Sequence, residues 1–231
     1  MNYLQTILDW SEVWSPLIPL TVFFIKRPKS NWVKPVVWYL VVAVLLILCA
    51  DIVWKRKFLH IETWFVENLA DYFRGTDGRI SNNMFYNILS VSRFLLFAWF
   101  FNYLGTRFKK INRFIPLIFL LLAIVNYSFF KNINDFSSRQ LAIEATLLLF
   151  YCLFYFHMVN LDDRIESPLS LPHFWVVTGL AIYTAVNFFI FLFYSYLMVQ
   201  SEQYAKDIWN VHNISYIILN LFIALALYKA R

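Results

Sequence analysis

The sequence has few of the residues that form turns, and this excludes whole classes of protein. Glycine occurs four times and proline seven times in 231 residues, so the chain is neither loop-rich nor of low complexity. Apolar residues make up 61% of it, against about 45–50% in an average soluble domain. The mean hydropathy is +0.58. A compact domain of this size could not hide so many apolar side chains from water, so we expect lipid to be the solvent.

Motifs for catalysis and cofactor binding are also missing. The sequence contains no HExxH, Walker loop, GxSxG or zinc-type Cys/His spacing. The last apolar run has no lysine inside it, because Lys206 precedes it and Lys229 follows it, so a retinal Schiff base is not expected. Haem needs two histidines at the same depth on facing helices, and only His157 and His173 come near this arrangement. We do not expect them to bind haem. We therefore predict no enzyme, no metal site and no cofactor.

Cysteine and N-terminal charge are scarce as well. Cys49 and Cys152 both fall inside apolar runs, near opposite faces, and are expected to be packing residues without a disulfide. The first nine residues contain Asp9 and no Lys or Arg, so the basic start of a signal peptide is missing. The first apolar run is therefore expected to remain as a membrane helix.

The apolar residues that are present form runs long enough to cross a bilayer, which takes about 20 mostly apolar residues. The chain is predicted to be a single all-α domain, 1–231, a bundle of about seven transmembrane helices. Pro16 and Pro19 predict a kink or an irregular start in the first helix, and Arg93 and Glu144 interrupt the third and fifth. The predicted spans are 8–25, 35–54, 84–104, 114–130, 139–159, 173–198 and 208–228.

The basic residues predict the orientation of the bundle. Net charge is +6, but Lys and Arg cluster between the apolar runs, where lipid headgroups lie, so nucleic acid is not expected as a partner. An outside N-terminus and a cytoplasmic C-terminus place eleven basic residues inside and eight outside. We expect an integral protein of the bacterial inner membrane. The inside set is Lys26, Arg27, Lys29, Lys34, Arg107, Lys109, Lys110, Arg113, Arg164, Lys229 and Arg231.

The loop between the second and third predicted helices carries a helical pattern of its own. Its apolar residues recur at helical spacing with acidic residues between them, which is typical of an amphipathic helix lying on the outer interface. Such a helix either only packs on the bundle or also gates a site. The apolar positions are Phe58, Ile61, Phe65, Leu69 and Tyr72.

Polar residues inside the predicted spans are the candidates for a site, because ionisable groups at membrane depth are costly. Most of them fall in the outer half of the bundle, which predicts a polar cavity open to the outside. Arg93 would pair with Glu144 or Asp51, since a lone buried charge costs several kcal/mol. The candidate ligand-binding residues are Arg93, Glu144, Asp51, Asn187, His212 and Asn213.

Structural explanations for the same residues stay open. Asn187, Asn213 and Asn220 are typical of hydrogen bonds between membrane helices. Arg93 and Glu144 fit a purely structural ion pair equally well, and Asp51, like Asp207, fits a solvated helix end. His212 is a candidate for ligand contact or for a pH response.

The C-terminal third resembles a known group of proteins. The pattern consists of Phe174-Trp175, Gly179, Tyr183, Asn187-Phe188-Phe189, Trp209, His212-Asn213 and Leu219-Asn220, and the segment 83–103 is similar to the group's third helix. It resembles bacterial standalone seven-helix proteins that are similar to the sensor modules of histidine kinases. The family often carries an acidic residue at the position of Arg93, so the charge at the site differs and the family's ligand is not expected to carry over to this chain. The resemblance also implies a role in signalling.

Three function classes remain. A sensor would bind a ligand in the outer cavity and pass helix shifts to a signalling partner at the cytoplasmic face. A small transporter would line a continuous path with polar residues, which are sparse in the inner half. An accessory or scaffold subunit of a membrane complex would keep the pair of Arg93 and Glu144 in a dry core. The geometry of the cavity distinguishes the three, and a sensor is the leading expectation.

Overall fold

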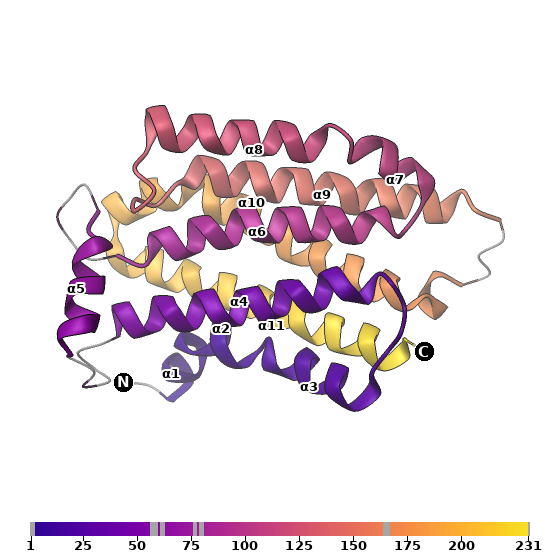
Figure 1. Cartoon of the computed structure of the whole chain (residues 1–231), viewed down its shortest axis with the longest axis horizontal. Coiled ribbons are helices and arrows are strands. Elements are labelled where there is room, and N and C mark those ends of the chain that lie inside the picture. Colours follow the sequence, from indigo (N-terminus) through magenta and orange to yellow (C-terminus); the bar gives the residue numbers. More distant parts are fainter. Residues whose placement is uncertain are drawn as a thin grey trace.

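The computed structural model is an elongated bundle of helices aligned along one axis (Figure 1). It describes residues 3–55, 60, 63–75, 78, 81–163 and 167–230. Within these ranges the regular elements are helices, and no β-strand is present. The predicted all-α fold class is therefore confirmed for the described part of the chain.

Six stretches of helix are long and apolar enough to cross a membrane. Their length follows from uninterrupted apolar sequence, which buries one face in the bundle and leaves the other for lipid. Of these six, counted within the described residues, the third joins three short elements in one span: α7 (Thr106–Ile111), α8 (Ile115–Val125) and η1 (Asn126–Phe130). The others are α4 (Val33–Trp54), α6 (Asn83–Asn102), α9 (Ser138–Asn160), α10 (Pro172–Gln200) and α11 (Glu202–Lys229).

The first predicted span, 8–25, is broken into three short helices: α1 (Tyr3–Asp9), α2 (Ser11–Trp14) and α3 (Leu17–Lys26). Pro16 lies directly before α3 and cannot donate the backbone hydrogen bond that would continue α2. Pro19 is tolerated because it sits in the first turn of α3, where backbone N–H groups have no intrahelical acceptor. The irregular start expected from the two prolines is thus observed.

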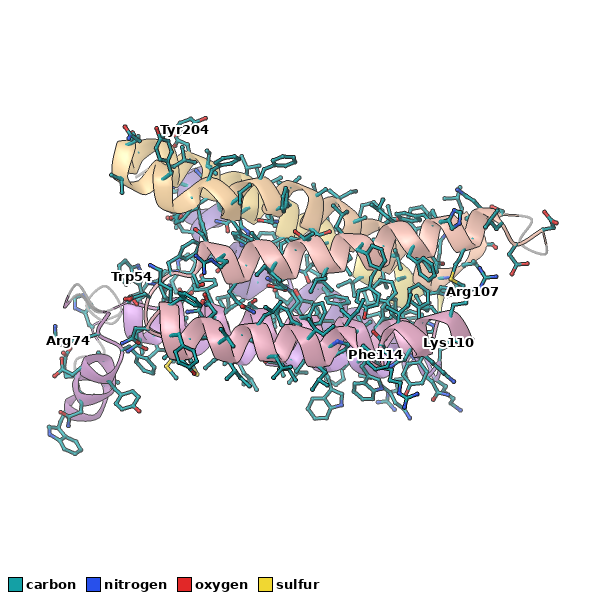
Figure 2. The ribbon with its side chains drawn as sticks, turned by 90° about the horizontal axis from the view of Figure 1, so that it is seen from above. Trp54, Arg74, Arg107, Lys110, Phe114 and Tyr204 are labelled. Atoms are coloured by element: carbon teal, nitrogen blue, oxygen red, sulfur yellow. The ribbon has the colours of Figure 1, made fainter. Side chains whose placement is uncertain are left out.

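The two ends of the bundle are formed by different elements. One end gathers the end of α4, the start of α6 and the junction of α10 with α11, and α5 (Trp64–Tyr72) lies across it (Figure 1). We call it the α5 end, and the opposite one the C-terminal end. Figure 2 shows Arg107 and Lys110 at the C-terminal end, and Arg74, Trp54 and Tyr204 at the α5 end.

Helix α5 coincides with part of the predicted amphipathic helix. Thr63 caps it by accepting a hydrogen bond from the N–H of Val66. Ala70 and Phe73 pack in one cluster with Val53 of α4, and Val66 is also buried. Of the predicted apolar stripe, Tyr72 is exposed. Phe58 and Ile61 lie outside the described residues, as do the side chains of Phe65 and Leu69.

The predicted start of the last helix, at residue 208, is too late in the chain. Helix α11 starts at Glu202 and not at 208, because Ser201 caps it by accepting a hydrogen bond from the N–H of Tyr204. Ser201 is also the C-cap of α10, so one residue joins the two helices. Asp207, which we expected at the entrance of the helix, lies within it and accepts a hydrogen bond from Gln203.

Helices α10 and α11 are in close contact at Gly179. A Cβ atom added at this glycine would lie 2.6 Å from Cβ of Phe222 and 3.4 Å from Cα of Leu219. Small residues at such positions allow membrane helices to pack backbone against backbone. The two helices therefore form a tight pair that carries much of the polar network described below.

Replacing Gly179 with alanine should destabilise the protein. The new methyl group would force α10 and α11 apart, at a cost of about 1–3 kcal/mol. Thermal unfolding of the purified protein in detergent should show a lower midpoint. Gly105→Ala is the matched control, because its nearest neighbour would be Cε of Met158 at 3.5 Å, an ordinary contact. Equal midpoints for the two variants would contradict the close approach.

Candidate functional site

A buried ion pair lies in the middle of the bundle. Arg93 of α6 meets Glu144 of α9 through two contacts, Nε to Oε1 at 2.5 Å and Nη2 to Oε2 at 2.8 Å. The remaining nitrogen, Nη1, donates to the hydroxyl of Tyr183 on α10 at 2.7 Å. Arg93 is 5% exposed and Glu144 is 1% exposed. The paired fork geometry satisfies both charges and ties three helices together.

The predicted alternative partner of Arg93 is wrong. Asp51 lies at the end of α4 and pairs with Lys55 one turn further along, with 3.0 Å between Nζ and Oδ1. The same ammonium donates to the backbone carbonyl of Asp9 and lies 3.9 Å from the centre of the Trp10 ring. Asp51 therefore belongs to the α5 end, away from the ion pair.

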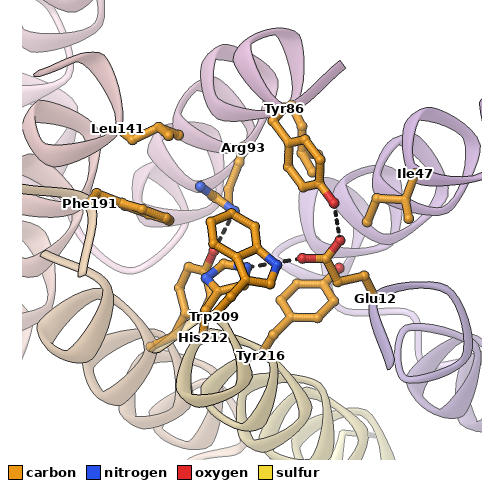
Figure 3. Close-up of a pocket in the computed structure, with 11 residues that line it drawn as sticks. Glu12, Ile47, Tyr86, Arg93, Leu141, Phe191, Trp209, His212 and Tyr216 are labelled. Carbon is orange, nitrogen blue, oxygen red and sulfur yellow. Dashed lines mark hydrogen bonds and ion pairs between the residues drawn. The ribbon is translucent and has the colours of Figure 1, made fainter. Parts of the chain in front are cut away.

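A second polar network is centred on His212 of α11. Its Nδ1 contacts Oδ1 of Asn187 on α10, and its Nε2 lies 3.1 Å from Oε1 of Glu12 on α2. The other oxygen of Glu12 accepts a hydrogen bond from the hydroxyl of Tyr86 on α6. Figure 3 shows Glu12 between the two partners. Residues far apart in sequence, 12 and 212, are thus direct neighbours.

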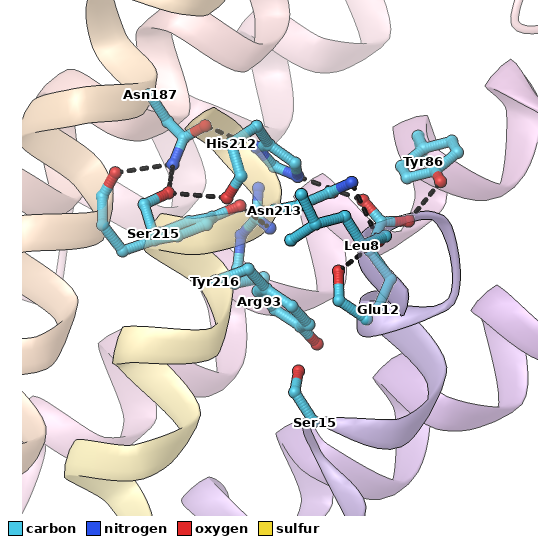
Figure 4. Close-up of polar contacts among 12 residues, drawn as sticks. Leu8, Glu12, Ser15, Tyr86, Arg93, Asn187, His212, Asn213, Ser215 and Tyr216 are labelled. Carbon is cyan, nitrogen blue, oxygen red and sulfur yellow. Dashed lines mark hydrogen bonds and ion pairs between the residues drawn. The ribbon is translucent and has the colours of Figure 1, made fainter. Parts of the chain in front are cut away.

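The hydrogen bonds around Asn187 fix where the protons lie (Figure 4). Its Nδ2 donates to the carbonyl of Tyr183 at 2.7 Å and to the hydroxyl of Ser215 at 2.8 Å, and Ser215 in turn donates to the carbonyl of His212. The oxygen of Asn187 therefore faces the imidazole, which must donate from Nδ1. The contact between His212 and Glu12 then requires one further proton, carried either by the imidazole or by the carboxyl group.

The two networks meet at Tyr183. Its hydroxyl accepts from Arg93 and its backbone carbonyl accepts from Asn187. Both of these residues are buried, as are His212 and Glu12. The side chains of α2, α6, α9, α10 and α11 are consequently joined in one chain of polar contacts, which is the arrangement expected where no water can replace a missing partner.

Two cavities adjoin this network. The inner cavity has a volume of about 20 Å³, which is enough for about one water molecule. Its polar wall is made by Glu12, Tyr86, Arg93, Tyr183 and His212 (Figure 3). Its apolar wall consists of Ile47, Leu89, Leu141, Phe191, Trp209 and Tyr216.

The second cavity, which we call the vestibule, lies at the α5 end and has a volume of about 390 Å³. Glu12, Tyr86 and Trp209 line both cavities, so these three side chains form the partition between them. The other residues of the vestibule are Gln5, Asp9, Asp51, Trp54, Lys55, Asn82, Asn83, Phe136, Tyr194, Asn210 and Asn213.

The structure brings together most of the predicted site residues. Arg93, Asn187 and His212 belong to the connected network, whereas Asp51 and Asn213 line the vestibule. Glu144 holds Arg93 but is not among the residues that line the inner cavity. A polar cavity at one end of the bundle, as predicted from the depth of these residues, is observed.

Sequence reasoning missed three members of the site. Glu12 was not among the candidates, and in the structure it joins α2 to α6 and α11. Tyr86 was not considered and Tyr183 entered only as part of the resemblance, because tyrosines are common in membrane helices and carry no signal of their own. Within the described ranges, no group of three or more His, Cys, Asp or Glu could hold a metal ion.

Comparisons with known proteins assign the chain to no family. No protein-family model, no curated protein and no solved structure matches it. The resemblance to seven-helix sensor modules therefore stays a prediction, and function has to be argued from the geometry of the two cavities.

Breaking the ion pair should cost more than removing it. Arg93→Met or Glu144→Gln alone leaves one buried group without its partner, a loss of about 3–5 kcal/mol. The double variant removes both charges and should recover much of that loss. Chemical unfolding of the four proteins in detergent gives the coupling free energy. Strictly additive effects would show that the two side chains do not depend on each other.

Proposed function

We propose that the chain is a sensor-like or receptor-like membrane protein with seven spans, in which the vestibule receives a ligand and the helices relay its binding. The six long helices and the broken segment α1–α3 make up the seven spans. Helix α5 lies on the outer interface. The observation that carries the proposal is that the vestibule is closed on its inner side by Glu12, Tyr86 and Trp209, with the inner cavity and Arg93 behind them.

Aromatic packing beyond Arg93 supports a blind cavity. Between Arg93 and the C-terminal end, aromatic rings pack against one another. The ring centres of Tyr39 and Phe97 are 4.8 Å apart, and those of Phe101 and Tyr151 are 5.0 Å apart. All four side chains are buried. A transporter needs a polar path that reaches both faces, and this layer of rings favours a dead-end binding site instead.

The broken segment provides a route for the signal. Glu12 of α2 contacts α11 and α6, and Ser15, directly after α2, accepts a hydrogen bond from Asn220 of α11. Helix α3 continues from there to Lys26, whose ammonium lies 4.2 Å from the ring of Tyr228 near the C-terminal end. A change in the contacts of Glu12 would therefore shift the segment that reaches the opposite end of the bundle.

The distribution of basic residues supports the orientation. Arg107, Lys109 and Lys110 lie at the C-terminal end together with Lys26 and Lys229, and Figure 2 shows Arg107 and Lys110 there. This clustering favours the cytoplasmic face of a bacterial inner membrane for this end. The vestibule then opens to the outside. A separate signalling protein would dock on the cytoplasmic loops and helix ends.

An accessory subunit of a membrane complex is the second candidate. The observation in its favour is that Glu144 neutralises Arg93 and Tyr183 accepts a further hydrogen bond from it, so the buried charge needs no ligand. In that case the polar network serves only to hold the helices in register. Motion at the C-terminal end separates the two candidates.

Glu12→Gln tests the relay without any knowledge of the ligand. The substitution replaces the carboxyl group that contacts His212 and Tyr86 with an amide, so α2 and α3 should shift by about 1–2 Å, as helices do in switching proteins. Spin labels at Ile25→Cys and Lys110→Cys, with the exposed Cys49 replaced by serine, would report the change as an altered distance distribution in lipid nanodiscs.

The control for this experiment is Asp71→Asn. It removes one carboxylate at the α5 end that pairs with Arg74 and does not line the vestibule. Its distance distribution should equal that of the unaltered protein. Identical distributions for Glu12→Gln and Asp71→Asn would overturn the relay and favour the accessory subunit.

A further inference from the structure

We infer that the vestibule binds a small organic cation, an amine that is protonated at neutral pH and attached to an apolar group. The inference rests on the proposed function and names the chemical class of its ligand. It is carried by three independent features of the vestibule: its charge, an unused buried acceptor and a cluster of aromatic rings.

The charge of the vestibule is negative. Asp9, Glu12 and Asp51 line it, and among the described residues of its wall Lys55 is the only basic one. The pair of Glu12 and His212 holds one proton and is neutral as a whole, so the excess negative charge is that of Asp9 and Asp51 over Lys55. The ammonium of Lys55 is already held by Asp51 and by the carbonyl of Asp9. Arg93 lies behind the partition and is neutralised by Glu144. A cation is therefore attracted to this cavity and an anion is repelled.

Asn213 offers an acceptor that no described residue uses. The side chain is 3% exposed and lines the vestibule, and its Nδ2 donates to the carbonyl of Leu8 at 3.1 Å. That bond fixes the orientation of the amide, so Oδ1 faces away from the carbonyl of Leu8. This oxygen has no hydrogen-bond partner among the described residues. A buried carbonyl oxygen of this kind calls for a donor, and an ammonium group supplies up to three.

The rings around the vestibule suit the apolar part of such a ligand and its charge. Trp209 contacts Tyr194 with 5.0 Å between ring centres and Tyr86 with 6.0 Å, and Phe136 lies 4.9 Å from Tyr194. All four rings line the cavity. Clusters of Trp, Tyr and Phe attract ammonium groups through their ring faces.

The size of the vestibule fits an organic molecule. Its volume of about 390 Å³ lies in the range of small-molecule sites, about 300–1,000 Å³. A bare metal ion is a poorer match, because the described residues contain no cluster of three or more metal-ligating side chains. The combination of carboxylates, a carbonyl acceptor and rings instead matches an amine.

Binding at this place would act directly on the relay. Glu12 belongs to the vestibule and also holds His212 and Tyr86. An ammonium group that approaches this carboxylate competes with the imidazole for it. The ligand would thus weaken the contact that ties α2 to α11.

Three molecules of nearly the same shape test the class of ligand: benzylammonium, benzyl alcohol and benzoate. Calorimetric titration of the full chain in nanodiscs should show saturable binding of benzylammonium. Benzyl alcohol should bind at least about tenfold more weakly, because it lacks the charge, and benzoate should not bind. Empty nanodiscs correct for partition into lipid. Equal binding of all three molecules, no saturable binding of benzylammonium, or tighter binding of benzoate would overturn the inference.

Two variants locate the site. Asp51→Asn and Glu12→Gln should each weaken binding of benzylammonium about tenfold, whereas Asp71→Asn should leave it unchanged. Circular dichroism confirms that the helices are intact, and if Glu12→Gln does not fold, Asp51→Asn decides. Unchanged affinity in the folded variants would place the ligand elsewhere and overturn the inference.

The two proposals fail in different ways. If Glu12→Gln shifts the labelled helices but benzylammonium does not bind, the relay stands and the class of ligand is wrong. If benzylammonium binds at the vestibule and saturation leaves the distances at the C-terminal end unchanged, the class of ligand stands and the relay is wrong.

Discussion

The guanidinium of Arg93 must keep its charge satisfied in a buried place with room for about one water molecule, and the surrounding polar structure depends on this requirement. Glu144 neutralises the charge and Tyr183 accepts the remaining hydrogen bond. A charge without these partners would cost several kcal/mol. The rotation of α6, α9 and α10 about their axes is therefore fixed at this depth, because each helix has to present one particular side chain to the other two.

The position of the second network follows from the first. With its hydroxyl held by Arg93, Tyr183 presents its carbonyl to Asn187, and the amide of Asn187 then has only one way to face His212. His212 in turn faces Glu12. Each hydrogen bond restricts the next one, from Arg93 on α6 to Glu12 on α2. A network of this kind is rigid only while every member has its partner.

The helical bundle could be predicted from the sequence because apolar runs of sufficient length have few other uses. The partnership of Arg93 with Glu144 could also be predicted, since both charges interrupt apolar helices at similar depth. The rotation of each helix about its own axis could not be predicted. In α4 the buried Val36 and Leu40 are as apolar as the exposed Trp38 and Leu45, so no periodicity separates the face in the core from the face toward lipid.

The same argument explains which site residues were missed. Glu12 stands only four residues before Pro16, and the sequence does not show whether a helix broken there still enters the bundle. Tyr86 and Tyr183 become polar partners only through the rotation of α6 and α10. Asp51 was misplaced as a candidate partner for Arg93, because a helix-end carboxylate with a lysine four residues later has a nearer partner along its own helix.

Because Glu12 lies on a very short helix, its side of the contact with His212 is held less firmly than the other side. Helix α2 has four residues and makes few hydrogen bonds of its own, so its place depends on tertiary contacts, whereas α11 has 28 residues and is fixed along its length by α10. Of the two partners in the contact between Glu12 and His212, the carboxylate side therefore yields more easily. Pro16 removes the backbone bond that would otherwise resist such a movement. A proton or a cation that changes this one contact would thus move the N-terminal segment against a bundle that stays in place.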